Sequence, residues 1–487
     1  MSVARQAAHG VAWNMLFGVG SRAVQLVGQL FLTRWILPHD YGATMAAWVA
    51  VLTAGCLTSF AFGQQLIAKK APPEIAFQAA VVHIAIGAVA MITVCLIRDP
   101  LSDAFDEPEM GQYVLGYAVA HMFERLRYVP ERLLVRALRF RTVATINGLG
   151  AIAYTGSALL TAKVWSWGGY AMVFAALVRG ALTFVLCIRA APRQEWLVRA
   201  RVRAADVRDL FAYGLPIMIA IVSDLAATRW DNLIVLNLFN AEVMGNYTLA
   251  YSLAEMPVLN IADQIAEVLM PSFSRMEDEQ RLRAVVRAAA LMGLVVSPLG
   301  VGLGAVASTV VDAFIDRRWT LMGPMLAILS IMTVFRPMTW SATAYAQAVQ
   351  KTRIVMYASF LRAGFVLSLV AIFGAVTRDP NWVCIGAGLG YAIHAVVVIT
   401  LAGRQTGFPV GAYLVGVLRP LLACVPMFLA VLGIKNVLEA ASVPAAASLA
   451  VQVTVGVIVY VISAFVLVRS SVNELLRLGR EALRRRR

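Results

Sequence analysis

The first apolar stretch of the chain carries a stripe of polar side chains that could bind a charged ligand. Its members follow one another mostly at intervals of three or four residues: Asn14, Gly18, Ser21, Arg22, Gln25 and Gln29. An α-helix would place them on one face. Arg22 is the charged member of the stripe and the best suited to bind an anion, because a planar guanidinium offers paired hydrogen bonds that suit phosphate or carboxylate oxygens. It would face either an anionic ligand or an acidic side chain on another helix, and both interpretations stay open.

A second polar stripe lies in the segment 211–238, where one helical face would carry Pro216, Ala220, Asp224, Thr228 and Asp231. Arg229 lies about 200° around a helix from Asp231, so the two cannot form a simple pair on one helix. Arg229 precedes Trp230, and it either faces a ligand or reaches the edge of the apolar layer. Asp224 and Asp231 are candidates for gating or for binding a coupling ion.

Further charged residues stand alone inside other apolar segments. The cations are Arg179, Arg336 and Arg362, and the candidate counter-charges are Glu124, Asp231, Glu255, Asp263 and Glu267. Several buried arginines suggest a cationic chamber that binds an anionic substrate. Pairing of every arginine with a carboxylate would explain the same residues without a ligand. Glu255 and Asp263 are two more candidates for ion coupling or gating.

Motifs that would indicate an enzyme are absent from the sequence. It contains no HExxH, GxSxG or Walker A pattern, and His83, His121 and His394 lack the spacing of metal ligands. The five cysteines stand singly in apolar segments, which predicts neither a disulfide nor a metal site. The glycine runs at 300–304 and 386–390 are interpreted as helix-packing positions. We therefore expect no catalytic residue, no metal and no cofactor.

The amino-acid composition indicates what kind of secondary structure carries these charged and polar residues. The 487 residues are 60% hydrophobic and only 14% charged, and the mean hydropathy is +0.75. Soluble proteins carry about 25% charged residues. The sequence therefore predicts an all-α polytopic membrane protein, whose net charge of +15 belongs to its loops and not to a nucleic-acid surface.

A helix that crosses a bilayer needs about 20 apolar residues, and on that basis the sequence predicts about fourteen transmembrane helices. They lie near 11–35, 42–63, 75–97, 111–127, 142–163, 167–190, 211–238, 243–270, 286–312, 320–347, 353–376, 381–403, 413–436 and 446–468.

The distribution of basic residues predicts the orientation. With the N-terminus inside, about 29 of the 42 lysines and arginines lie in cytoplasmic segments and about 7 lie outside. An even number of helices then leaves both termini in the cytoplasm. We interpret the tail "RLGREALRRRR" as a solvated topology determinant, and attachment to anionic lipid is the alternative.

An internal repeat divides the chain into lobes. The segment "ILPHDYGATMAAWVA" (36–50) resembles "LFNAEVMGNYTLAYSLA" (238–254), with Gly42 and Gly245 in equivalent places. Six helices separate the copies, so the repeat is parallel, and two pseudo-symmetric six-helix lobes should surround a central cavity. The predicted parts are an N-terminal lobe (1–192), a basic linker (193–210), a C-terminal lobe (211–404), two further helices (405–469) and a basic tail (470–487).

These repeat segments resemble a known family. "FLTRWILPHDYGATMAAWVAV" is similar to the "aRlLspedfGl" segment of polysaccharide exporters, and "YGLPIMIAIVSDLAATRWDNLIVLNLFNAEVMGNYTLAYSLAEMP" resembles the opening of their second half. "ERLLVRALRFRTVA" looks like their cytoplasmic segment after the fourth helix. This is the polysaccharide transporter (Wzx-like) branch of the multidrug/oligosaccharidyl-lipid/polysaccharide flippase superfamily. The chain departs from the pattern at Trp35, Ile36 and Ala43.

The resemblance implies a flippase in the bacterial cytoplasmic membrane that moves undecaprenyl-diphosphate-linked oligosaccharides to the outer leaflet by alternating access. Its partners would be that lipid-linked oligosaccharide, membrane lipid, H⁺ or Na⁺, and a polysaccharide polymerase and chain-length protein. The expected substrate-binding residues are Arg22, Asn14, Gln25, Gln29, Arg179, Arg336, Arg362 and Arg229.

Three other functions remain as alternatives. A lipid II flippase and a cation-coupled multidrug exporter belong to the same superfamily, although an exporter of cationic drugs would need an anionic chamber. A membrane oligosaccharide polymerase would need a large outer loop, and the outer loops here are short.

Overall fold

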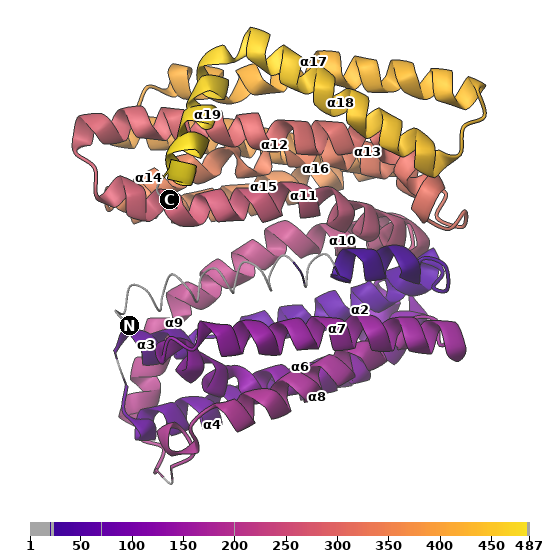
Figure 1. Ribbon diagram of the computed structural model, residues 1–487. Helices are drawn as coiled ribbons and strands as arrows, with labels where there is room; N and C mark the ends of the chain where they lie inside the picture. The colour runs from indigo at the N-terminus through magenta and orange to yellow at the C-terminus, as the bar shows by residue number, and fades with distance from the viewer. Residues whose placement is uncertain (1–19, 21–23, 70, 199, 485–487) are drawn as a thin grey trace. The chain divides into compact units, whose positions relative to one another are not determined.

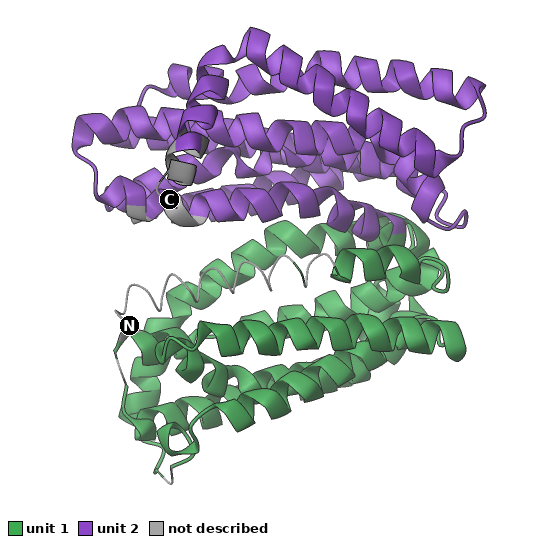
Figure 2. Cartoon of the chain, viewed as in Figure 1, with its two compact units in different colours: residues 1–245 green, residues 246–487 purple. Residues whose placement is uncertain are grey.

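The computed structural model describes residue 20 and residues 24–69, 71–198 and 200–484 (Figure 1). The described part of the chain is helical nearly throughout and contains no strand, which confirms the all-α prediction. It divides into two compact units, Met1–Gly245 and Asn246–Arg487 (Figure 2).

The first unit begins with a helical segment at 24–32 that includes the end of the first predicted span. Its further helices are α2 (Pro38–Leu57), α3 (Phe62–Ala68), α4 (Pro73–Leu96), α5 (Arg98–Ala104), α6 (Pro108–Arg136), α7 (Phe140–Val164), α8 (Tyr170–Ala190), the 3₁₀ turn η1 (Arg193–Glu195), α9 (Ala204–Leu225), the π-helical turn η2 (Ala226–Trp230) and α10 (Asp231–Leu238).

The second unit contains most of α11 (Ala241–Ser274), which begins just before the boundary. Its further helices are α12 (Asp278–Phe314), α13 (Met322–Thr333), the 3₁₀ turn η3 (Arg336–Thr339), α14 (Trp340–Ala348), α15 (Thr352–Thr377), α16 (Pro380–Thr406), α17 (Val410–Ala440), α18 (Ala445–Leu467) and α19 (Arg469–Arg484).

Each predicted span from the second to the fourteenth coincides with one helix or with successive helices. Over the described residues, ten helical segments are long and apolar enough to cross a membrane. The protein is therefore a multi-pass membrane protein, as predicted. The full number of about fourteen crossings stays a prediction.

Three predicted spans are interrupted rather than continuous. The span 42–63 ends as a helix at Leu57 and resumes at Phe62, after Ala61 adopts a left-handed φ of 48°. The span 320–347 changes to a 3₁₀ turn at 336–339, where Pro337 lacks the N–H that an α-helix needs. The span 211–238 widens into a π-helical turn, a feature that often marks functional sites.

The linker predicted at 193–210 is held against the first unit by hydrogen bonds. The Gln78 side chain donates to Asp206 (3.0 Å) and accepts the Arg203 backbone N–H (3.1 Å). α9 then packs against α2, α3 and α4, so the first compact unit extends beyond the predicted N-terminal lobe. The predicted lobes are defined by the repeat and not by compactness, and their boundaries stay a prediction.

In the second unit, α12 packs along α17 and α18, and α15 packs against α16. The predicted tail 470–487 contains most of α19, which returns to α12. There Arg287 forms an ion pair with Glu474 (2.7 Å), and Val472 packs against Leu294. The described part of the tail is therefore a docked amphipathic helix.

The equivalent glycines of the repeat contact one another's helix. Gly42 of α2 leaves no room for a Cβ because the Ala241 carbonyl oxygen abuts it, and Gly245 of α11 faces the Pro38 carbonyl in the same way. Pro38 and Ala241 are 203 residues apart, as are Gly42 and Gly245. This reciprocal contact is what a local two-fold axis produces, and it explains why the repeat needs glycine at both positions.

Gly42→Ala is expected to lower the free energy of unfolding by about 1–3 kcal/mol, because a rigid backbone carbonyl cannot move aside for the added methyl group. Thermal unfolding of the purified protein in detergent measures the loss. Gly156→Ala in α7 is the matched control, since open space surrounds Gly156 and alanine favours helix by about 1 kcal/mol. Equal stability of the two variants would refute the close contact.

Candidate functional site

The first polar stripe lies only partly within the described residues. Asn14 and Arg22 lie outside them. Gln25 and Gln29 are half-buried on the helical segment 24–32. The Oε1 atom of Gln29 is buried and has no hydrogen-bond partner among the described residues, so an acceptor is available on the predicted polar face.

Arg229 contacts an aromatic ring of α2. Its guanidinium lies 5.4 Å from the centre of the Trp48 ring, within the range of a cation–π contact. The next residue, Trp230, donates its indole N–H to the Thr53 hydroxyl (3.1 Å). The two neighbouring side chains thus join the π-helical turn to α2, a contact that neither sequence interpretation of Arg229 included.

Asp224 and Asp231 do not share one environment, although a regular helix would place them on one face. Asp224 is exposed on α9, whereas Asp231 is 1% exposed and accepts the backbone N–H of Asn232 (3.0 Å). The π-helical turn between them adds a residue to the helical repeat and rotates the chain beyond it. The shared polar face was therefore wrongly predicted. A buried carboxylate makes Asp231 the stronger candidate for ion coupling or gating.

Arg179 is half-buried on α8. The stem of its side chain lies beside Gly150 of α7, and it interacts electrostatically with Tyr154. This arginine therefore belongs to the packing between α7 and α8, where it stays a candidate for substrate binding.

In the second unit, the structure brings together two residues that the sequence had assigned different roles. Arg336 of η3, a predicted substrate ligand, forms an ion pair with Glu255 of α11, a predicted coupling residue. Their side chains are only 12% and 15% exposed. The Arg336 guanidinium also lies 5.6 Å from the centre of the Tyr391 ring, and Tyr391 accepts a hydrogen bond from Tyr251 (2.8 Å). The 3₁₀ turn thus places a cation in a cluster of acidic and aromatic side chains.

Arg362 and Asp263 are half-buried on α15 and α11. Arg362 interacts electrostatically with His394 of α16, whose Nε2 lies 2.9 Å from the Ala358 carbonyl oxygen. Buried on α16, His394 therefore contributes to the contact with α15.

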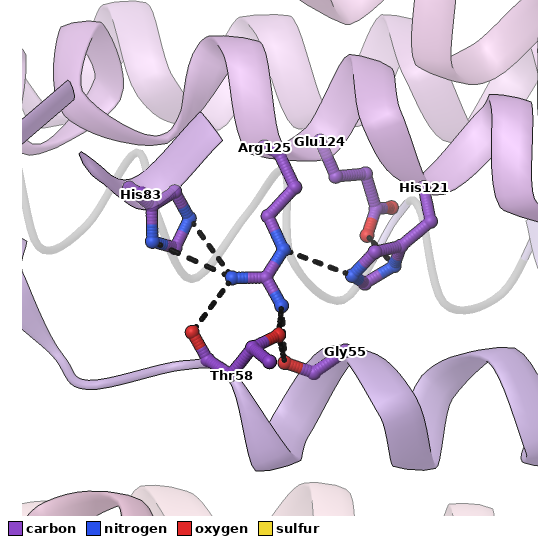
Figure 3. A network of polar contacts seen from close by, with 6 residues as sticks. All are labelled: Gly55, Thr58, His83, His121, Glu124 and Arg125. Carbon is purple, nitrogen blue, oxygen red and sulfur yellow. Dashed lines mark hydrogen bonds and ion pairs between the residues drawn. The ribbon is translucent and has the colours of Figure 1, made fainter. Parts of the chain in front are cut away.

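A network around Arg125 was not predicted from the sequence (Figure 3). This residue of α6 is 4% exposed and donates to the Thr58 carbonyl (3.2 Å), the Thr58 hydroxyl (2.7 Å) and the Gly55 carbonyl. These acceptors lie where α2 ends. The guanidinium thus adds a charged donor to carbonyl groups at the end of α2, where the α-helical hydrogen bonds stop, and its charge complements the negative end of the helix dipole.

Two histidines complete the network. Arg125 Nε donates to His121 Nε2 (3.3 Å), and Arg125 Nη1 lies 3.4 Å from the ring nitrogens of His83. Because arginine only donates, His121 must accept at Nε2 and carry its proton on Nδ1, which faces Glu124 at 3.6 Å. The His83 ring also stacks on Tyr128, with 4.3 Å between ring centres.

Part of this network has a signal in the sequence. His121, Glu124 and Arg125 are spaced by three and four residues, so they share a face of α6. The partners Thr58 and His83 come from other helices, and no spacing along the chain connects them to Arg125. The structure therefore gives His83 and His121 a shared partner, Arg125, that was not predicted from the sequence.

The fold resembles a solved transporter structure. The lipid II flippase MurJ, in an inward closed conformation, matches with a TM-score of 0.73 at 13% sequence identity, covering 94% of this chain and 99% of that one. At this identity the likeness shows the fold alone, and it confirms the predicted all-α polytopic architecture.

The family model for polysaccharide biosynthesis proteins matches residues 31–324, and the chain belongs to this family. Two relatives cover most of its length. ExoT of Rhizobium meliloti (strain 1021), a succinoglycan biosynthesis transport protein, is 23% identical, and the alignment covers 98% of this chain and 96% of ExoT. WzxC of Escherichia coli (strain K12), a lipopolysaccharide biosynthesis protein, is 20% identical, and the alignment covers 82% of this chain and 80% of WzxC. The predicted family is therefore confirmed.

Proposed function

We propose that the protein is a flippase that moves undecaprenyl-diphosphate-linked oligosaccharides from the inner to the outer leaflet by alternating access. The observation that carries this proposal is the similarity to ExoT, a transport protein of polysaccharide synthesis, over nearly the whole chain. The likeness to the flippase MurJ supports the same mechanism. The function is transport and not catalysis, and the product would serve exopolysaccharide, capsule or O-antigen synthesis.

The residue chemistry suits this substrate. A diphosphate that crosses hydrocarbon needs compensating cations, for which Arg22, Arg179 and Arg362 are the proposed ligands. A sugar needs hydrogen-bonding side chains, such as Gln25 and the buried acceptor of Gln29. The lipid tail can stay in the bilayer while the head group crosses.

The ion pair between Arg336 and Glu255 has a proposed role in the transport cycle. Without substrate, Glu255 neutralises the Arg336 guanidinium inside the protein. When the diphosphate arrives, its oxygens replace the carboxylate, and the freed Glu255 becomes available to bind H⁺ or Na⁺. An inside-negative potential would assist the outward step by about 2.3 kcal/mol per charge per 100 mV.

The cellular setting follows from the same proposal. The protein would lie in the bacterial cytoplasmic membrane with both termini in the cytoplasm, as the distribution of basic residues indicates. A polysaccharide polymerase and a chain-length protein would act on the exported oligosaccharide at the outer leaflet.

Deletion of the gene tests the proposal. The mutant is expected to lose surface polysaccharide and to accumulate oligosaccharide-diphosphate lipid on the inner leaflet, because synthesis continues without export. Mass spectrometry of extracted lipids measures the trapped intermediate, and complementation with the intact gene is the control. Normal surface polysaccharide together with increased drug sensitivity would instead indicate a multidrug exporter. Accumulation of lipid II would indicate a peptidoglycan flippase.

A further inference from the structure

A histidine and two glutamates converge where two helices of the first unit begin. His39 lies in the first turn of α2, and Glu107 and Glu109 lie at the start of α6. His39 Nε2 is 3.4 Å from Glu107 Oε2, and His39 Nδ1 is 3.6 Å from Glu109 Oε2. Asp40 is close as well, at 3.9 Å from His39 Nδ1. Because these residues are far apart in the sequence, their spacing could not reveal the cluster.

The cluster holds more negative charge than its surroundings neutralise. The Glu107 side chain is 7% exposed and points at His39, and burial raises the pKa of its carboxyl group. Over the described residues, the ion pairs of Glu107 and Glu109 are with His39 alone. Three carboxylates, including Asp40, thus face one imidazole that is half-exposed and open to a ligand from solution.

A structural role explains only part of this arrangement. An acidic residue in the first turn favours a helix through the helix dipole, and this accounts for Glu109. It does not account for the burial of Glu107, since an exposed carboxylate would interact with the dipole without the cost of desolvation. Nor does it account for the imidazole between the carboxylates.

We propose that His39, Glu107 and Glu109 form a binding site for a divalent cation of the zinc class. One donor atom from each residue can be chosen so that all three lie within 4.8 Å of one another. Tetrahedral zinc, with bonds of about 2.0–2.2 Å, places its ligands about 3.4 Å apart, so small side-chain rotations would complete the site. A fourth ligand is available from Asp40 or water. The imidazole favours zinc over calcium and magnesium, which prefer oxygen ligands.

Because of where the site lies, a bound ion would affect how the helices of the first unit pack. His39 follows Pro38, whose carbonyl contacts Gly245 at the crossing of α2 and α11. A bound ion would join the start of α2 to the start of α6 and hold this crossing in place. In the orientation proposed above, the site opens to the outside of the cell, where it can exchange with external zinc. Binding itself does not depend on the transported substrate.

Calorimetric titration of the metal-free, full-length protein in detergent with zinc chloride tests the site. The expected result is one Zn²⁺ per chain and a higher unfolding temperature with zinc. His39→Ala and Glu107→Gln should each weaken binding at least about tenfold. Asp103→Asn, which removes an exposed carboxylate from neighbouring α5, is the control and should bind like the natural protein.

Three outcomes would overturn the proposal: no stoichiometric binding by the natural protein, equal affinity after His39→Ala, or tighter binding of Ca²⁺ than of Zn²⁺. If Glu107→Gln fails to fold, His39→Ala still decides, because the His39 side chain is 43% exposed and its removal leaves the helix starts intact.

Discussion

Arg336→Ala is expected to abolish transport and to lower the free energy of unfolding by about 3–5 kcal/mol. The substitution leaves Glu255, whose side chain is only 15% exposed, without its cationic partner, and an unpaired buried charge is costly. It also removes the cation from the face of Tyr391. Glu255→Gln should cost less stability, because the guanidinium keeps its contact with the Tyr391 ring.

The double variant Arg336→Met/Glu255→Leu separates stability from transport. Replacing both members of a buried ion pair by apolar side chains of similar size is often neutral for stability, so this protein should unfold near the temperature of the natural one. If Arg336 binds the diphosphate, transport should nevertheless stay lost. Thermal unfolding in detergent and the amount of lipid-linked oligosaccharide in a complemented deletion strain measure the two effects.

The matched control is Arg353→Ala, which removes an exposed arginine at the start of α15 and should leave both stability and transport unchanged. Restored transport in the double variant would show that the ion pair serves only the fold. Full stability of Arg336→Ala would show instead that Glu255 reaches solvent or another partner.

Residue types and apolar runs predicted the elements of this fold well, because length and hydropathy alone determine which segments can cross a bilayer. They did not predict the interruptions. The break after Leu57 needs a left-handed Ala61, a conformation that the alanine side chain does not favour. Tertiary contacts from α6 stabilise that break, so no pattern within 42–63 could reveal it. Only the 3₁₀ turn at Pro337 had a local cause.

Sequence reasoning likewise found the charged residues but not their partners. Arg336 and Glu255 were each recognised as charged residues inside apolar segments, yet 81 residues separate them, and only the ion pair between η3 and α11 in the structure shows that they are partners. The repeat gave better guidance, since Gly42 and Gly245 were equivalent by sequence and prove to be reciprocal in space. A contact between residues that are far apart in the sequence leaves no periodic pattern along the chain, unless the chain contains an internal repeat.

Arg125→Met is expected to destabilise the first unit by about 3 kcal/mol or more. Methionine fills much of the space but donates no hydrogen bond, so the carbonyl oxygens of Gly55 and Thr58 would lose a buried charged donor. His121 would also lose the proton donor at its Nε2 atom. We expect a lower unfolding temperature and faster proteolysis at 58–61, where α2 and α3 separate.

The variant Arg125→Lys separates the contribution of the positive charge to stability from that of the planar guanidinium shape. A single ammonium group keeps the positive charge beside the end of α2, but it cannot reach Gly55, Thr58 and His121 together as the planar guanidinium does. Its stability should therefore fall between those of the natural protein and Arg125→Met. Arg139→Met, an exposed arginine after the end of the same helix, should change stability by no more than about 0.5 kcal/mol.

The ranking of these variants by stability and by transport shows which role Arg125 has. If the network only terminates α2, transport should decline in proportion to the folded fraction, and lysine should preserve more of both than methionine. If Arg125→Met folds normally yet fails to transport, the helix-end role is wrong, and the guanidinium acts on the substrate or on the transport cycle. Because Arg125 is 4% exposed in the present conformation, such an action would require the break between α2 and α3 to open and release it.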